Sequence, residues 1–354
     1  MKFKELAIYF EEIELNKSRL IITELLASLF RKLSKEEIKS TIYLLQGRVV
    51  PLYEKLEFGI AEKMMIKSIV KALNQDEKLF NNMYKKIGDL GQTVEKFKKE
   101  IKSFEEKDLS INEVYVNLYQ LATASGEGSQ EKKINILANL IRQLDPLSCR
   151  YLVRIPLGVM RLGFSDMTVL DAFSWMLKGD KSLRKIIEKA YHVHPDLGQI
   201  GYVLKEKDID GLKGIKPTVG TPILMMRAER LSLAQEIIEK IGRCAVEPKY
   251  DGFRLQIHYR KKDQLVRLFS RNLEDVTFMY PDIVEAVGKQ IKADEIIFEG
   301  EAVGFNPSTG DFLPFQETVQ RKRKYQIKEK AKKIPLKLFA FELLYINGKN
   351  FIEE

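Results

Sequence analysis

Cysteine and histidine are scarce in this sequence. Its 354 residues include two cysteines, Cys149 and Cys244, and three histidines. Two cysteines cannot form a disulfide framework or, by themselves, a structural zinc site. Because His192, His194 and His258 have no ligand-like spacing with the cysteines, these residue types predict no metal site.

Segments that would place the chain in a membrane are also missing. No run of about 18 apolar residues occurs, which excludes a transmembrane helix. Residues 1–14 mix acids into their apolar stretch and lack the apolar core of a signal peptide. We therefore expect a soluble protein of a reducing compartment, located in the cytoplasm and associated with the nucleoid if the cell is prokaryotic, with no membrane partner.

Length and charge narrow the class of protein. Apolar residues make up 45% of the chain, enough to bury a core in each of roughly two domains of about 150–200 residues. The 59 Lys and Arg exceed the 50 Asp and Glu, for a net charge of +9. This excess favours an anionic partner such as nucleic acid. Many lysines lie beside glutamates, so solvated helix faces explain the charge equally well.

The spacing of apolar residues divides the chain into two parts. Residues 1–205 repeat apolar positions every three or four residues, which predicts helices, one of them capped by Ser34. Glycines and prolines in 206–222 predict a linker. Residues 223–354 hold short alternating runs typical of strands. We expect a multidomain protein, with an all-α domain followed by an α+β domain that has a mainly antiparallel sheet. The predicted strands are 254–259, 265–269, 295–298 and 336–344, and the predicted helix is 281–292.

A candidate nucleophile lies near the start of the second part. No glycine-rich phosphate loop follows a strand, so a nucleotide would have to be held in another way. Residues 247–254 read EPKYDGFR, with Lys249 between Glu247 and Asp251. A lysine attacks only after losing its proton, and burial or a neighbouring cation lowers its pKa. An ion-paired surface lysine is the commoner role, and the motif alone leaves both open.

Three further segments accompany this motif. They are 269–277 (FSRNLEDVT), 297–303 (IFEGEAV) and 337–345 (KLFAFELLY). In this order and spacing, the four segments resemble the motifs of the covalent nucleotidyltransferases, which comprise ATP-dependent DNA ligases, RNA ligases and mRNA capping enzymes.

The helical part resembles only one of these classes. Residues 43–51 (YLLQGRVVP), 124–133 (ASGEGSQEKK), 151–154 (YLVR) and 158–164 (GVMRLGF) are similar to the helical DNA-binding domain of replicative DNA ligases of the archaeal and eukaryotic type. RNA ligases and capping enzymes do not carry this domain. The resemblance covers essentially the whole chain.

The resemblance implies an ATP-dependent DNA ligase that seals nicks in duplex DNA during replication, repair and recombination. It implies a DNA-binding domain over 1–205 and the N-terminal part of an adenylation domain over 223–354. The reaction would use ATP and Mg²⁺, and it would pass through a lysyl-AMP and then a DNA-adenylate. The implied partner is nicked double-stranded DNA, with a sliding clamp as a further candidate, and we expect a monomer.

Carried over by position, Lys249 would attack the α-phosphate of ATP. Glu247 would accept a hydrogen bond from the adenine amino group and so select ATP over GTP. Arg254 and Arg271 would contact the ribose and phosphate region, where fixed cations stabilise developing charge. The structural alternative for Arg271 is an ion pair with the acidic residues that follow it.

The remaining site residues come from the third and fourth segments. Glu301 would lie near the ribose or a metal ion, and Phe341 would stack on adenine. Glu342 would help to position the divalent ion, although the family more often has Asp there. The alternatives are a core position for Phe341 and a solvated strand face shared by Glu299 and Glu301.

Contacts with DNA are expected from the helical domain, where glycines let backbone N–H groups approach phosphates. An ordinary helix-breaking turn is the alternative for 126–129. The basic stretch 321–333 suits either DNA or a solvated helix. The residues assigned to DNA are Gly126, Gly128, Ser129, Lys133, Arg154 and Arg161.

A ligase of this family would continue beyond residue 354. It would add a Glu-Gly segment that binds metal, a lysine segment that contacts the α-phosphate, and an OB-fold domain that closes over DNA. We expect complete nick sealing to need these parts and the chain alone to be impaired. A non-catalytic DNA-binding module is the alternative function.

Overall fold

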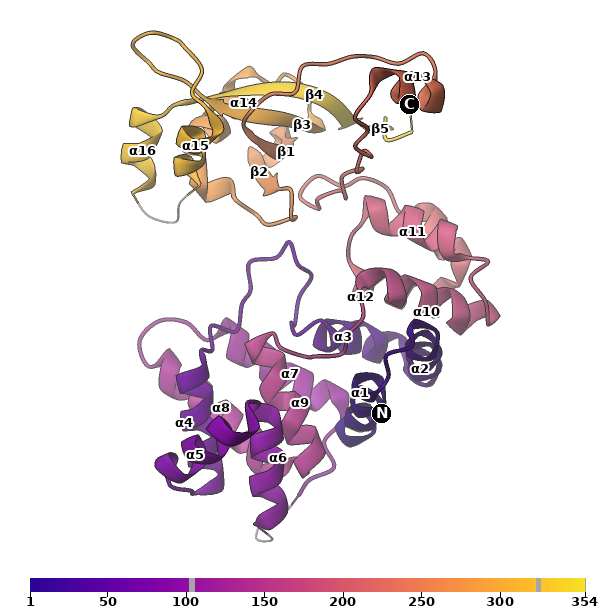
Figure 1. The fold of residues 1–354 in the computed structure, drawn as a ribbon, viewed down its shortest axis with the longest axis vertical. Coiled ribbons are helices and arrows are strands. Elements are labelled where there is room, and N and C mark those ends of the chain that lie inside the picture. Colours follow the sequence, from indigo (N-terminus) through magenta and orange to yellow (C-terminus); the bar gives the residue numbers. More distant parts are fainter. Residues whose placement is uncertain (102–105, 323–325, 354) are drawn as a thin grey trace. The chain divides into compact units, whose positions relative to one another are not determined.

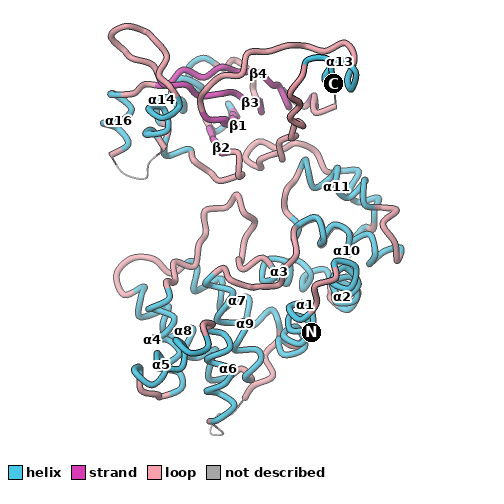
Figure 2. Tube along the Cα trace, in the orientation of Figure 1, coloured by secondary structure: helices cyan, strands magenta, loops and turns pink. Residues whose placement is uncertain are grey.

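The computed structural model describes residues 1–101, 106–322 and 326–353, and it divides into two compact units. The first comprises Met1–Tyr191 and Asp196–Ile215, and the second comprises His192–Pro195 and Lys216–Glu354. Figure 2 shows helices throughout the first unit and strands in the second. The boundary falls inside the linker that the sequence predicts, because its last residues pack with the second unit.

The first unit is all-α, as its apolar spacing predicts. No helix within the described ranges is both long and apolar enough to cross a membrane. The helices, which Figure 1 labels in chain order, are α1 (Phe3–Leu15), α2 (Arg19–Lys32), α3 (Lys35–Leu45), α4 (Glu62–Leu73), α5 (Glu77–Ile87), α6 (Leu90–Glu100), α7 (Ile111–Thr123), α8 (Ser129–Gln143), α9 (Pro146–Leu157), α10 (Asp166–Lys178), α11 (Arg184–Val193) and α12 (Leu197–Lys207), followed by the 3₁₀ turn Ile209–Gly214.

Side-chain caps set where many of these helices begin. Ser34 accepts a hydrogen bond from the Glu37 N–H, and the Glu37 carboxylate accepts one from the Ser34 N–H. This reciprocal pair satisfies two backbone donors that a helix N-terminus leaves open, and it confirms the predicted cap. The core lies where apolar helix faces meet, most closely between α3 and α12, α4 and α8, α6 and α9, and α2 and α10.

A charged cluster is buried among α1, α6 and α9. The Arg154 side chain is 1% exposed, and its guanidinium lies 2.7 Å from a Glu14 oxygen and 3.2 Å from an Asp89 oxygen. Burial alone would raise the pKa of Glu14, but hydrogen bonds from Arg154 and Tyr151 hold it below its usual value. Since Asp89 also caps α6, the cluster joins three helices through one guanidinium.

The second unit is built on one antiparallel sheet with strand order β2-β1-β3-β4-β5. This confirms the α+β class, and β3 extends to Gly304, six residues beyond its predicted end. The strands are β1 (Phe253–Arg260), β2 (Leu265–Ser270), β3 (Glu295–Gly304), β4 (Leu336–Ile346) and β5 (Lys349–Asn350). The helices are α13 (Ala234–Ile241), α14 (Pro281–Gln290), α15 (Phe315–Thr318) and α16 (Ile327–Lys333), with 3₁₀ turns at Lys261–Asp263, Thr277–Met279 and Val319–Arg321.

The two faces of β1 are buried in different ways. Leu255, Ile257 and Tyr259 point to one face and join the apolar core that includes residues of α14. On the other face, Gln256 is 5% exposed and His258 is fully buried. Alternating polar residues ordinarily indicate a face open to water. Here that face is covered, so its polar groups must find partners inside the protein.

We predict that Arg154→Ala lowers the free energy of unfolding of the first unit by about 3–5 kcal/mol, because it removes the buried cation that two carboxylates share. Among the cations of the described residues, Glu14 would keep only Arg150, at 3.8 Å, and Asp89 only the exposed Arg161. Equilibrium denaturation followed by the fluorescence of Trp175, the single tryptophan, measures this change.

The matched control is Arg161→Ala. The Arg161 side chain is 55% exposed and lies 3.1 Å from an oxygen of the same Asp89. Because the guanidinium of this pair is exposed to water, we expect the pair to contribute less than about 1 kcal/mol. Equal losses in the two variants would show that burial of the Arg154 cluster is not what stabilises the unit.

Candidate active site

A cleft of about 1420 Å³ opens in the second unit. Its wall combines the loop before β1 with parts of β1, β3 and β4 and the turn after β2. Every residue that the sequence assigns to nucleotide or metal binding lines this one cleft. They are Glu247, Lys249, Arg254, Arg271, Glu301, Phe341 and Glu342.

The loop 247–252 is fixed at the three residues that follow Lys249. The Tyr250 ring stacks on Phe339, with 4.4 Å between ring centroids. The Asp251 carboxylate accepts a hydrogen bond of 3.2 Å from the Phe315 N–H. Gly252 packs directly against the backbone of the neighbouring strand β3. These contacts hold the backbone that directly follows the lysine and leave the Lys249 side chain exposed.

Lys249 itself forms no ion pair with any described residue, although Glu247 and Asp251 are close in sequence. The structure therefore does not show Lys249 as an ion-paired surface lysine, which was the non-catalytic alternative. An exposed amine without a carboxylate partner remains able to meet an anion or an electrophile in the cleft.

Arg271 stands at the tip of a tight turn between β2 and the rest of the unit. The Ser270 hydroxyl accepts hydrogen bonds of 3.3 Å from the N–H groups of Asn272 and Glu274. Leu273 adopts a left-handed conformation with φ of 64°, which is uncommon for a residue with a side chain. Arg271 forms no ion pair within the described ranges, so pairing with the acids that follow it is not observed.

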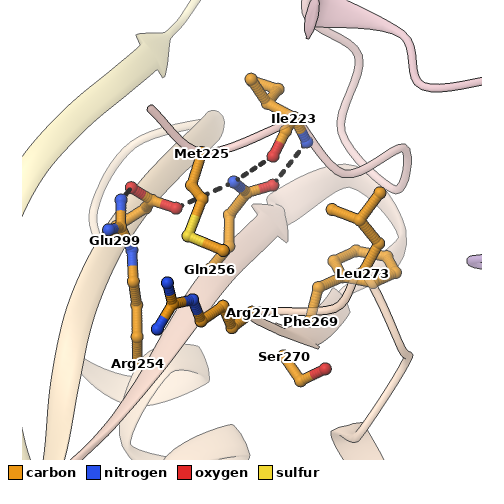
Figure 3. A pocket seen from close by; sticks show the side chains of 9 residues that line it. All are labelled: Ile223, Met225, Arg254, Gln256, Phe269, Ser270, Arg271, Leu273 and Glu299. Atoms are coloured by element: carbon orange, nitrogen blue, oxygen red, sulfur yellow. Dashed lines mark hydrogen bonds and ion pairs between the residues drawn. The ribbon is translucent and has the colours of Figure 1, made fainter. Parts of the chain in front are cut away.

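Arg254 lies deeper in the cleft. It forms an ion pair with Glu299, and its guanidinium carbon lies 5.3 Å from the centroid of the Phe341 ring. Phe341 is 37% exposed and so is not a core residue. Figure 3 shows the Arg271 side chain reaching toward Arg254. The cations and the exposed aromatic ring thus share one wall, which suits a ligand with both phosphate and a flat ring.

The alternative of a solvated strand face does not hold for Glu299, which is buried. Glu299 is 4% exposed. It accepts a hydrogen bond of 3.1 Å from the Gln256 side chain and forms an ion pair with Arg254. Figure 3 shows Gln256 between Glu299 and Ile223. Sequence reasoning missed Gln256 and His258; the signal was the run of polar residues at every second position of β1.

The acids of the cleft suit a hard cation. Burial raises the pKa of Glu301, against the opposing effects of the Gly252 N–H and of the Lys249 and Arg254 charges. Glu342 is exposed on β4 and lines the same cleft. The described residues contain no group of three or more potential metal ligands. Two carboxylates completed by phosphate oxygens are a usual site for Mg²⁺.

The residues assigned to DNA separate into two groups in the first unit. Gly126 and Gly128 are exposed in the turn before α8, with φ of 82° and 74°, and Ser129 begins the helix. The Ser129 N–H donates a hydrogen bond of 3.2 Å to the Gly126 carbonyl. Because no side chain caps α8, the N–H groups of Gln130 and Glu131 stay open to an acceptor. Arg161 is also exposed, with its partner Asp89 beside it.

Lys133 and Arg154 lie inside the first unit. The Lys133 ammonium donates a hydrogen bond of 2.6 Å to the Phe58 carbonyl, and its side chain is 9% exposed. Arg154 is held by Glu14 and Asp89. Both cations are therefore committed to internal contacts, and this placement favours structural roles over phosphate contacts.

The basic stretch 321–333 is also divided. Arg321 is buried, forms a hydrogen-bonded ion pair with Asp282 and lies over the Tyr280 ring at 5.9 Å. Arg323 and Lys324 lie outside the described residues. The lysines of α16 are exposed or partly exposed, and Glu329 is the one acidic residue of that helix.

Comparison with known proteins agrees with this architecture. Residues 2–174 match the family model "DNA ligase N terminus", and residues 225–354 match "ATP dependent DNA ligase domain". The chain belongs to the ATP-dependent DNA ligase family. The second unit is accordingly an adenylation domain, and the family identifies an enzyme class that forms phosphodiester bonds.

Curated relatives match nearly the whole chain. A probable DNA ligase of Dictyoglomus thermophilum is 51% identical over 350 residues, which are 99% of this chain and 59% of the relative. The DNA ligase of Saccharolobus solfataricus is 44% identical over 362 residues, which are 99% and 60%. DNA ligase 2 of Thermofilum pendens is 43% identical over 364 residues, which are 100% and 60%. The chain spans about three fifths of the length of these ligases.

We predict that Gly252→Ala destabilises the adenylation domain by about 1–3 kcal/mol through overpacking. An added Cβ would lie 2.2 Å from the Ala302 carbonyl oxygen, so the loop that carries Lys249 would have to move. Urea denaturation followed by tyrosine circular dichroism measures the change. Gly288→Ala in α14 is the control, since its Cβ meets nothing within 4 Å and alanine favours a helix by about 0.5–1 kcal/mol. A harmless Gly252→Ala would contradict the close approach.

We also predict that His258 stays neutral across the range in which exposed histidines titrate. Burial lowers its pKa to about 3, with a smaller contribution from the Arg267 charge. Nuclear magnetic resonance of the three histidines should show one ring that does not titrate between pH 8 and pH 5, and His258→Asn should remove that signal. A His258 midpoint near 6.5 would contradict its burial among fixed donors and acceptors.

Proposed function

We propose that the protein to which this chain corresponds is an ATP-dependent DNA ligase that seals nicks in duplex DNA through a lysyl-AMP and a DNA-adenylate. The observation that carries the proposal is the cleft itself. Residues assigned from four separate segments line it together, around a lysine that has no ion-pair partner among the described residues.

In the first step, the neutral Lys249 amine attacks the α-phosphorus of ATP. A P–N bond forms while the bond to the oxygen that bridges the α- and β-phosphates breaks, and pyrophosphate leaves with that electron pair. The nitrogen then gives up one proton to solvent, which leaves the phosphoramidate. Arg254 and Arg271, which line the same cleft, would stabilise the charge that develops on the phosphoryl oxygens. Phe341 offers the exposed ring on which adenine stacks, and Glu247 offers a carboxylate acceptor for the adenine amino group.

Glu301 and Glu342 would hold Mg²⁺, whose positive charge favours departure of pyrophosphate. The raised pKa of Glu301 adds a pH dependence to this role, because a protonated carboxyl group is a poor ligand. Metal binding should therefore weaken on the acid side sooner than an unperturbed glutamate would predict.

The first unit would bind the duplex on either side of a nick. The open N–H groups in the first turn of α8 and the exposed Arg161 suit phosphates, and such contacts position DNA without reading its sequence. Transfer of AMP to the 5′-phosphate and attack by the 3′-hydroxyl would follow in the full-length enzyme. Roles in replication, repair and recombination, a cytoplasmic location, monomeric action and a sliding-clamp partner are further parts of the proposal that follow from the family.

We predict that incubation with ATP and Mg²⁺ adds one AMP to the wild-type chain and none to Lys249→Ala, because the amine is the nucleophile. Intact-mass spectrometry measures the adduct. Lys262→Ala is the matched control: this exposed lysine follows β1 and does not line the cleft, so its variant should react like the wild type.

If the wild-type chain gains no adduct, the same incubation is repeated with the protein extended to the length of its relatives. Absence of the adduct there as well would overturn the ligase proposal. It would favour a non-catalytic DNA-binding module, which should bind duplex DNA with log K falling against log salt and be indifferent to Lys249→Ala.

A further inference from the structure

The segment that leads into the adenylation domain, residues 219–225, lies across the polar face of β1 without forming a strand. Val219 and Ile223 are 6% and 3% exposed and pack with Ile297 of β3. We call these residues the lead-in segment. Backbone ladder hydrogen bonds do not attach it to the sheet, so side chains must do so.

Gln256 supplies the principal attachment. Its side-chain oxygen accepts a hydrogen bond of 2.7 Å from the Ile223 N–H, and its side-chain nitrogen donates one of 2.9 Å to the Ile223 carbonyl. Figure 3 shows this pair of bonds. One carboxamide thus satisfies both backbone groups of a buried residue, as a neighbouring strand would.

His258 fixes the orientation of that carboxamide. The Gly220 N–H donates a hydrogen bond of 3.1 Å to Nδ1 of His258, so Nδ1 is an acceptor. The proton of the neutral ring must then be on Nε2, which lies 2.9 Å from the Gln256 oxygen and donates to it. A rotated amide would place its NH₂ group against two other donors, so only one orientation is compatible with the network.

The same carboxamide reaches the cleft. Gln256 and Glu299 are paired directly across the β1–β3 ladder. The Gln256 nitrogen lies 3.1 Å from one oxygen of Glu299, and the other Glu299 oxygen pairs with Arg254. Beyond Ile223, Met225 lines both the cleft and the small pocket formed with Arg254 and Gln256. A loss of Gln256 would therefore release the lead-in segment and one of the two supports of Glu299.

We propose that Gln256 is a positioning residue for lysine adenylation: it fixes the lead-in segment and orients Glu299, which in turn sets the direction of Arg254 in the cleft. This inference rests on the proposed function, because Arg254 acts there on the nucleotide. Gln256 does not itself reach the reacting atoms.

The test compares Gln256→Met, which keeps the length of the side chain, and Gln256→Glu, which sets a carboxylate against Glu299. Single-turnover adenylation over a range of ATP concentrations separates the maximum rate from the half-saturating concentration. Both variants should lose rate at saturating ATP, on the order of 10- to 100-fold. Gln264→Glu, an exposed glutamine in the turn after β1, is the charge-matched control and should keep the wild-type rate.

The single variant Glu299→Gln gives a readout that a general folding defect would not move. It keeps both hydrogen bonds between the Gln256 side chain and the Ile223 backbone but removes the acid that pairs with Arg254. This variant should therefore keep the wild-type exchange of the lead-in segment while losing adenylation rate.

Hydrogen exchange provides the structural readout, independent of activity. Amides of 219–225 should exchange faster in Gln256→Met, while those of the β1–β3 ladder keep their protection and so exclude unfolding. Unchanged exchange in 219–225 would overturn the attachment. A wild-type rate and half-saturation in a Gln256→Met protein would overturn the positioning role. No adduct in the wild type, in either length of chain, would instead be a failure of the ligase proposal, and exchange would still decide the attachment.

Discussion

A buried carboxylate must be paired, and the pairing of Glu299 constrains the whole active-site face of the adenylation domain. Glu299 is 4% exposed, and Arg254 and Gln256 occupy its two oxygens. An isolated charge at this depth would cost several kcal/mol, so removing either partner leaves a strongly unfavourable state. As a result, Arg254 is held in the cleft by Glu299, which is itself buried.

The proposed nucleophile is arranged in the opposite way. The three residues that follow it are fixed by ring stacking, a side-chain acceptor and close backbone packing, but Lys249 has no ion-pair partner within the described residues. Arg271 is likewise exposed at the end of a strained turn. Cations without partners around a cleft provide a preorganised field for an anion, at the expense of domain stability. The active-site face thus combines a buried ion pair, which fixes Arg254, with the exposed cations Lys249 and Arg271, which are unpaired in the described part of the chain and remain available to a ligand.

Much of this was predictable from the sequence. Periodicity located the helical unit, the Ser34 cap and four strands, because each depends on local spacing. Motif order identified the cleft residues. Burial was not predictable where a segment distant in the sequence determines it. The alternating polar residues of β1 predict a face exposed to solvent, but residues 219–225 cover that face. For the same reason Lys133 and Arg154 suggested phosphate contacts, since a cation that pairs internally and one that meets DNA look alike in sequence.

The most direct test of the account is the position of transferred phosphorus. ATP labelled at the α-phosphorus and ATP labelled at the γ-phosphorus are incubated separately with the protein and Mg²⁺, and the digested protein is mapped by tandem mass spectrometry. The account predicts α label on the peptide that carries Lys249 and no γ label anywhere. Label from the γ position, or α label on another residue, would contradict it.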